Sequence, residues 1–89
     1  MDIVFDKSFS KSLDKIKSNP LKSKIEQIII EMEGADSIKD IRKLKKMTGH
    51  KLFFRIRIGD YRLGLELENN NILRLIVIAH RKDIYKIFP

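Results

Sequence analysis

The fold is decided by residues 54–63, FRIRIGDYRL, in which apolar and charged side chains alternate on both sides of Gly59-Asp60. Alternation with a period of two is the pattern of a half-buried strand. A Gly-Asp pair between two such runs is typical of a two-residue hairpin loop of type II′. The sequence therefore predicts an antiparallel hairpin in which Ile58 is paired with Tyr61.

This register divides the hairpin into two faces, because successive side chains of a strand point to opposite sides of the sheet. Arg57 opposite Arg62 is unfavourable by itself, since like charges across a strand pair repel each other. A bound anion would relieve this repulsion, so the face that carries it is predicted to be functional. That polar face holds the pairs Arg57–Arg62, Arg55–Gly64 and Phe53–Glu66, and the apolar face holds Ile56–Leu63 and Phe54–Leu65.

A further strand is predicted over residues 72–79, which are almost entirely apolar and follow the turn signal Asn69-Asn70-Asn71. A two-residue loop would place Arg74 on the apolar face, where an unpaired charge is costly. We therefore predict a three-residue loop, with His80 near the strand end on the polar face. The resulting pairs are Glu66–Arg74, Leu65–Leu75 and Leu63–Val77.

The N-terminal half reads as a short strand, residues 3–5, followed by two amphipathic helices. Asp6 or Ser8 can cap the first helix, which should end near residues 18–19 because the residue before a proline avoids helical geometry. Pro20 suits the first turn of the second helix, and Gly34 suits its end. Two helices with a short link form an αα-hairpin.

Residues 42–46 form a basic segment that suits a short edge strand, and residues 81–87 suit a last helical turn. The predicted fold is therefore α+β and a single domain, residues 1–89. We expect an N-terminal strand and an αα-hairpin packed on one face of a mainly antiparallel four-stranded sheet, with the other face open.

Charge is distributed unevenly along the chain, whose net charge is +7. Residues 1–41 carry seven Lys, no Arg and eight acids, whereas residues 42–89 carry six Lys, six Arg and four acids. Arginine is the planar, bidentate phosphate binder, so its confinement to one half favours a polyanion site there. A surface that merely keeps the protein soluble is the alternative.

Other classes of protein are disfavoured by the composition. The absence of cysteine excludes disulfides and thiolate metal sites, and two histidines alone give no zinc-ligand set, so we expect no metal and no cofactor. The acidic N-terminal residues do not suit a signal peptide, and the longest apolar run, residues 75–79, is too short to cross a bilayer. We expect a soluble cytoplasmic protein without membrane contact.

The hairpin motif of residues 54–63 and the ending of residues 78–85, IAHRKDIY, resemble those of the RelE/ParE toxin superfamily. The order of elements is also similar over essentially the whole chain. The resemblance implies a toxin of a type II toxin–antitoxin system, silenced by a small antitoxin. RelE-like members are endoribonucleases that cut mRNA on the ribosome without metal and block translation, whereas ParE-like members share the fold and inhibit DNA gyrase. We expect the RNA-cleaving activity, with gyrase inhibition as the alternative.

The resemblance also implies roles for particular residues. Arg62 matches the arginine that holds the scissile phosphate, Arg81 matches a second arginine, and Tyr85 matches an aromatic residue that stacks on or protonates the substrate. Two lysines that the family carries on the first hairpin strand do not carry over, and by motif position their places hold Phe53 and Arg55. His80 can substitute for a missing proton acceptor, because an imidazole has an ordinary pKa of about 6.5.

The remaining basic residues are candidates for RNA binding, namely Arg55, Arg57, Lys43, Lys45, Lys46 and Lys82. Each assignment has a plainer alternative: edge lysines discourage strand pairing, a histidine after a buried strand is more often structural, and a tyrosine near the end of a chain is more often a packing residue. A plain RNA-binding module is less well supported, since the polar face offers only Phe53 for stacking. The expected partners are a cognate antitoxin, which should cover the open face near Ile76 and Ile78, and the ribosome with its mRNA.

Overall fold

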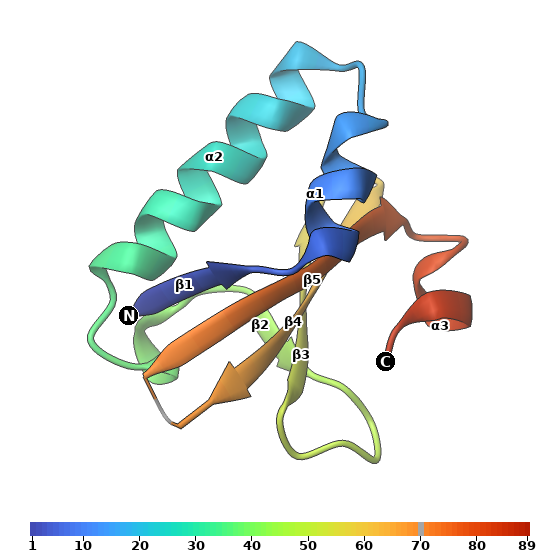
Figure 1. The fold of residues 1–89 in the computed structure, drawn as a ribbon. Coiled ribbons are helices and arrows are strands. Elements are labelled where there is room, and N and C mark those ends of the chain that lie inside the picture. The colour runs from blue at the N-terminus through green and yellow to red at the C-terminus, as the bar shows by residue number, and fades with distance from the viewer. Residues whose placement is uncertain (70) are drawn as a thin grey trace.

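The computed structural model describes residues 1–69 and 71–89, and in it one five-stranded sheet is covered on one face by two helices (Figure 1). The strands are ordered β1-β5-β4-β3-β2 across the sheet. The elements are β1 (Asp2–Phe5), α1 (Lys7–Asp14), α2 (Asn19–Gly34), a 3-10 turn (Ile38–Asp40), β2 (Leu44–Lys46), β3 (Phe53–Ile58), β4 (Tyr61–Glu68), β5 (Ile72–His80) and α3 (Ile84–Ile87).

The central hairpin has the predicted register. Ile58 pairs with Tyr61 and Arg57 with Arg62, and the pairing continues in step to Phe53 and Glu66. Gly59 has a φ of +60°, as the first central residue of a type II′ turn requires. The two faces of the hairpin are therefore confirmed.

The pairing of β4 with β5 agrees with the prediction only in its first half. Glu66 lies opposite Arg74 and Leu65 opposite Leu75, so the three-residue spacing of the loop is confirmed, although Asn70 lies outside the described residues. A bulge follows between Gly64 and Leu65. The predicted pairing of Leu63 with Val77 is therefore wrong: Leu63 pairs with Ile78, and Val77 pairs with Gly64.

The bulge reverses which side chains of β5 face the helices. Ile78 is 3% exposed in the core beneath the helices, whereas Val77 is buried on the opposite face. The predicted exposed apolar strip therefore does not include Ile78. Ile76 is half-buried and packs against the cluster that contains Val77.

The sheet has five strands rather than the predicted four, because β1 joins it. β1 runs parallel to β5, with Ile3 opposite Leu73. Nothing in the four residues of β1 indicates which strand they pair with. The short basic strand β2 pairs with β3 at the other edge, as predicted.

The helices begin where predicted, but the first ends early. The Asp6 carboxylate accepts a hydrogen bond from the Ser8 backbone N–H and caps α1, which ends at Asp14 rather than near residue 18. Ser18 instead caps α2, with Pro20 in the first turn. In the part of the chain that the structure describes, no helix is long and apolar enough to cross a bilayer.

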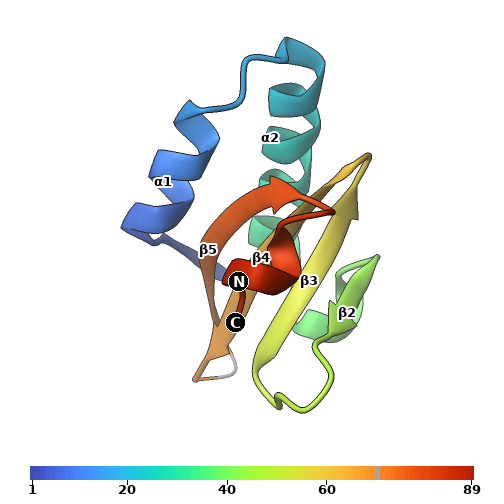
Figure 2. The same cartoon turned by 90° about the vertical axis from the view of Figure 1, so that its right-hand side faces the viewer.

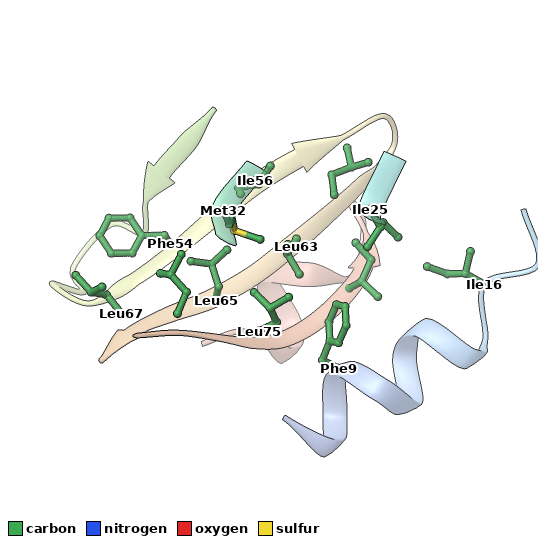
Figure 3. Close-up of a cluster of buried hydrophobic side chains, with 13 residues drawn as sticks. Phe9, Ile16, Ile25, Met32, Phe54, Ile56, Leu63, Leu65, Leu67 and Leu75 are labelled. Carbon is green, nitrogen blue, oxygen red and sulfur yellow. The ribbon is translucent and has the colours of Figure 1, made fainter. Parts of the chain in front are cut away.

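The main core lies between these two helices and the sheet (Figure 3). Phe9 from α1 and Ile25 and Met32 from α2 point toward the apolar face of the hairpin and are at most 1% exposed. Leu63, Leu65 and Leu75 meet them from the sheet and are fully buried. This packing fixes the hairpin, so its polar face is presented on the far side.

The far side is not fully open, which corrects the predicted architecture. The chain after β5 folds back over the sheet, and Figure 2 shows α3 lying across the strands on this side. Met47, Val77, Ile84 and Phe88 form a second, smaller core there. The part left uncovered is the end of the hairpin that carries the arginines.

Candidate active site

A cleft of about 620 Å³ lies on the uncovered part of this face. Six of its lining side chains are basic, and none is acidic. A concave surface with charge of one sign concentrates counter-ions, so the cleft is suited to a polyanion. Its lining residues are Lys43, Lys45, Arg55, Arg57, Gly59, Arg62, Arg81 and Tyr85.

Four parts of the chain converge on the cleft. Strand alternation on β3 brings Arg55 and Arg57 to one face, and Lys45 of β2 lies opposite Arg55. The backbone N–H of Arg81 donates to the Asp60 carbonyl at 2.7 Å. This bond ties the segment after β5 to the hairpin turn, so residues far apart in the sequence share the cleft.

Arg62 is hydrogen-bonded to the hairpin turn beside the cleft. Its Nη1 donates to the carbonyls of Gly59 at 3.0 Å and Tyr61 at 2.9 Å, which holds the guanidinium beside the turn. Burial, followed by the charges of Arg57 and Arg55, lowers the pKa of Arg62. Burial is the largest cause, and the neighbouring charges of Arg57 and Arg55 add a repulsion that an anion bound in the cleft would offset.

Tyr85 supplies the aromatic group of the cleft. The Arg55 Cζ lies 5.8 Å from the centroid of the Tyr85 ring, within the range of a cation–π contact. The side chain is 60% exposed, so a face or edge of the ring can meet a substrate. Arg62, Arg81 and Tyr85, which the sequence analysis singled out, line this one cleft.

His80 is not among the residues that line the cleft. Its ring packs edge-on against Tyr61, with centroids 5.5 Å apart, and its Nδ1 accepts a hydrogen bond from the Lys82 backbone N–H at 3.2 Å. The β5 bulge reverses the strand's alternation and turns this side chain toward α1. The predicted position of His80 on the polar face is therefore wrong.

The other predicted RNA-binding residues differ in their positions. Lys43, Lys45, Arg55 and Arg57 line the cleft. The remaining two, Lys46 and Lys82, lie outside it: Lys46 lines an adjoining hollow of about 360 Å³ that shares Arg55 and Tyr85 with the cleft, whereas Lys82 is exposed at the surface. Sequence reasoning gave no role to His50, which lines the same hollow, and nothing in the sequence pointed to it.

Arg74 does not line the cleft and forms ion pairs with two acidic residues elsewhere. It lies opposite Glu66 in the register, but its Nε contacts the Glu68 carboxylate at 2.5 Å and its Nη1 lies 3.8 Å from Asp6. The predicted Glu66–Arg74 ion pair is thus replaced by a pair with Glu68, whose hydrogen bond raises the pKa of Arg74. In residues 1–69 and 71–89, no cluster of three or more His, Asp or Glu side chains could hold a metal ion.

The chain is similar to known proteins in both sequence and fold. No family model matches the sequence. The chain is 36% identical to Toxin RelE3 of Methanocaldococcus jannaschii over 90 residues, covering 100% of both chains. A chain of the RelB–RelE antitoxin–toxin complex from Methanococcus jannaschii is 33% identical, with a TM-score of 0.79 over 97% of this chain and 99% of that one.

More distant structures share the fold alone. A chain of the intact Escherichia coli RelBE toxin–antitoxin complex is 16% identical, with a TM-score of 0.69 over 89% of this chain and 94% of that one. A chain of the archaeal RelE–RelB complex from Pyrococcus horikoshii has a TM-score of 0.71 at 16% identity, over 90% and 93% of the two chains. The full-length identity to Toxin RelE3, together with the fold, shows that the chain belongs to the RelE family of toxins.

Proposed function

We propose that this toxin is a metal-independent endoribonuclease that cleaves mRNA on the ribosome in the cytoplasm and thereby blocks translation. The observation that carries the proposal is the cleft that Arg55, Arg57, Arg62 and Arg81 line together with the exposed ring of Tyr85. Guanidinium groups bind phosphate through paired N–H donors, and an aromatic ring stacks on a base. The combination fits a nucleotide better than a simple anion.

The reaction uses the RNA's own 2′-hydroxyl as nucleophile. The 2′-oxygen attacks the adjacent phosphorus and gives its proton to a solvent water molecule, the bond from phosphorus to the 5′-oxygen breaks, and that oxygen takes up a proton. The products are a 2′,3′-cyclic phosphate and a 5′-hydroxyl. Arg62 and Arg81 stabilise the charge that grows on the phosphate oxygens, which fixed donors do most effectively. Arg55 and Arg57 support them in binding the phosphate.

Proton transfer is assigned first to Tyr85, which lines the cleft. A phenol has an ordinary pKa of about 10, so Tyr85 acts as a proton donor to the leaving oxygen or as a stacking platform. His80 remains a proposed contributor to catalysis. Since its Nδ1 is hydrogen-bonded to the backbone beside Arg81, it acts by fixing that segment, and direct proton transfer requires the ring to leave Tyr61.

The basic residues around the cleft guide the RNA strand. Lys43 and Lys45 lie at one side of the cleft, and Lys46 leads into the adjoining hollow. Lys82 extends the positive surface beyond Arg81. Phosphate contacts of this kind supply affinity without sequence preference.

The proposed protein partner is a cognate antitoxin. The similar chain from Methanococcus jannaschii was crystallised in a RelB–RelE complex, at 33% identity over nearly the whole of both chains. The net charge of +7 favours an acidic partner.

Primer extension on an mRNA translated in vitro tests the proposal. The wild-type protein should produce cuts confined to codons occupied by ribosomes, and Arg62→Ala should not. Arg42→Ala is the matched control, because Arg42 is exposed and lines a different hollow with Asp36 and Asp40. Inhibition of DNA gyrase without any RNA cleavage would overturn the proposal in favour of a ParE-like activity.

A further inference from the structure

The tail that carries Tyr85 is anchored to the sheet by two apolar residues one helical turn apart. The backbone N–H of Phe88 donates to the Ile84 carbonyl at 2.8 Å, and the two side chains are 3% and 0% exposed. Residues four positions apart lie on the same side of a helix. Tyr85 follows Ile84 directly, so it lies about 100° around the helix from the anchored side and faces the cleft.

The anchor at Phe88 depends on a glycine in the centre of the sheet. Gly64 lies between Arg55 on β3 and Val77 on β5. A Cβ atom added at Gly64 would lie only 2.7–2.9 Å from three atoms of the Phe88 ring, closer than any real contact of this kind. The ring therefore occupies the space that a side chain at Gly64 would fill.

A left-handed backbone conformation does not explain the glycine. Gly64 lacks the positive φ that would favour glycine, and glycine weakens the interior of a strand. The ring of Phe53 also packs edge-on against the ring of Phe88, and the two ring centroids are 5.5 Å apart. Phe88 thus fits into a site that is formed by Gly64 and Phe53 and is directly adjacent to Arg55.

We propose that Gly64 and Phe88 are positioning residues, and that the phenyl ring seated on the glycine holds the tail so that Tyr85 lies against Arg55 at the cleft. Arg55 is the link, because it pairs with Gly64 on the sheet and contacts the Tyr85 ring. The inference rests on the proposed function only in that Tyr85 takes part in RNA cleavage. It adds two residues that touch no substrate and yet determine where the aromatic group stands.

Four variants of the full chain test this arrangement: Gly64→Ala, Phe88→Ala, the double variant and Ile87→Ala. Gly64→Ala should fold normally, since the added methyl group points away from the main core and alanine suits a strand at least as well. It should displace the Phe88 ring, abolish the nuclear Overhauser contact between the Tyr85 ring and the Arg55 side chain, and speed exchange of the Phe88 amide hydrogen. Ile87→Ala is the matched control, because Ile87 belongs to the same tail but is 58% exposed.

Ribosome-dependent cleavage gives the second measurement. Misplacing a catalytic group by about 1 Å costs on the order of 100-fold in rate, so kcat of Gly64→Ala should fall by about that factor. KM should change little, because the arginines still bind the phosphates. The clash requires both the methyl group and the ring, so the glycine substitution should have no further effect in the Phe88→Ala background.

Three results would overturn the inference. One is a Gly64→Ala protein that keeps the Tyr85–Arg55 contact. Another is a protein that loses this contact and keeps wild-type kcat. The third is a double variant whose losses simply multiply. A wild-type protein that cleaves no RNA would refute the proposed function instead, while the dependence of the tail on Gly64 would still be decided by the nuclear Overhauser measurement.

Discussion

Arg57 and Arg62 lie directly opposite each other on β3 and β4, at the turn end of the hairpin and inside one cleft. Two like charges in this position repel each other. Neither side chain has a carboxylate within salt-bridge distance among the described residues. A ligand with negative charge would therefore relieve the repulsion between Arg57 and Arg62 and bind favourably between them.

Arg62→Ala should abolish RNA cleavage while leaving the fold intact. Loss of one preorganised donor to the transition state typically costs on the order of 100-fold or more in rate. Relief of the repulsion with Arg57 offsets the two hydrogen bonds that the guanidinium makes to the turn. Arg62→Lys should recover only part of the activity, because lysine keeps the charge without the paired donors. Growth arrest, cleavage and melting temperature measure the effects, and a folded Arg62→Ala that stays fully toxic would show that the site is elsewhere.

Arg57→Gln should raise the melting temperature of the free protein and weaken its binding to single-stranded RNA. The stabilisation should shrink as salt is added, since exposed charges are screened. A lost phosphate contact should make the slope of log K against log salt shallower by about 0.7. Fluorescence polarisation with a labelled oligonucleotide gives both quantities. Arg42→Gln changes the net charge equally outside the cleft and should leave the slope unchanged.

His80→Ala and Tyr85→Ala should differ in their effect on cleavage. Tyr85 lines the cleft and His80 does not, so we expect a loss on the order of 100-fold for Tyr85→Ala and less than about tenfold for His80→Ala. Tyr85→Phe separates the two roles of the ring: full activity indicates stacking, and a loss like that of alanine indicates proton donation. Single-turnover cleavage rates are the measurement. A greater loss for His80→Ala would mean that the imidazole enters the cleft when RNA binds.

Asp6 should contribute stability that depends on pH. Hydrogen bonds from Ser8, with a smaller contribution from the charge of Arg74, lower the pKa of the Asp6 carboxyl below its ordinary 3.8. A carboxylate with a depressed pKa in the folded state stabilises the protein fully above 3.8 and loses this contribution as pH falls through the lower folded value. The difference in melting temperature between wild type and Asp6→Ala should therefore be constant near neutral pH and vanish in acid. Asp6→Asn keeps a capping side chain and should lie between them. A difference that persists in strong acid would contradict this account.

The sequence determines the hairpin well because three independent signals agree there. Alternation, the Gly-Asp turn and the cost of burying Arg74 together give the register from Phe53 to Glu66 and half of the next strand. The cleft arginines follow from this register. By contrast, the bulge has no signal, since residues 75–79 are all apolar and fit either face equally well.

The tail shows a second limit of local patterns. Phe88 and Ile84 look like ordinary residues of a short helical turn, and only the folded structure shows that they cover Val77 and Gly64. The predicted register already places Gly64 opposite Arg55. Phe88, which packs on Gly64, lies 24 positions later in the chain, and no local pattern connects the two. The neighbour of β1 was hidden for the same reason, because such contacts depend on tertiary packing rather than on periodicity.

The bulge in β5 shifts the rest of the strand by one residue relative to β4. With the extra residue present, Ala79 lies opposite Arg62, and Arg81 comes next on the same side and enters the cleft. Deleting Ile76 would remove the bulge and leave His80 opposite Tyr61, whereas straightening the strand with Ile76 kept, so that Ile76 paired with Gly64, would exchange the two side chains and turn His80 toward the arginines and Arg81 toward α1. Loss of the bulge without loss of a residue is thus a route by which descendants of this fold could replace a permanently charged group with a titratable one, without altering any residue of the hairpin.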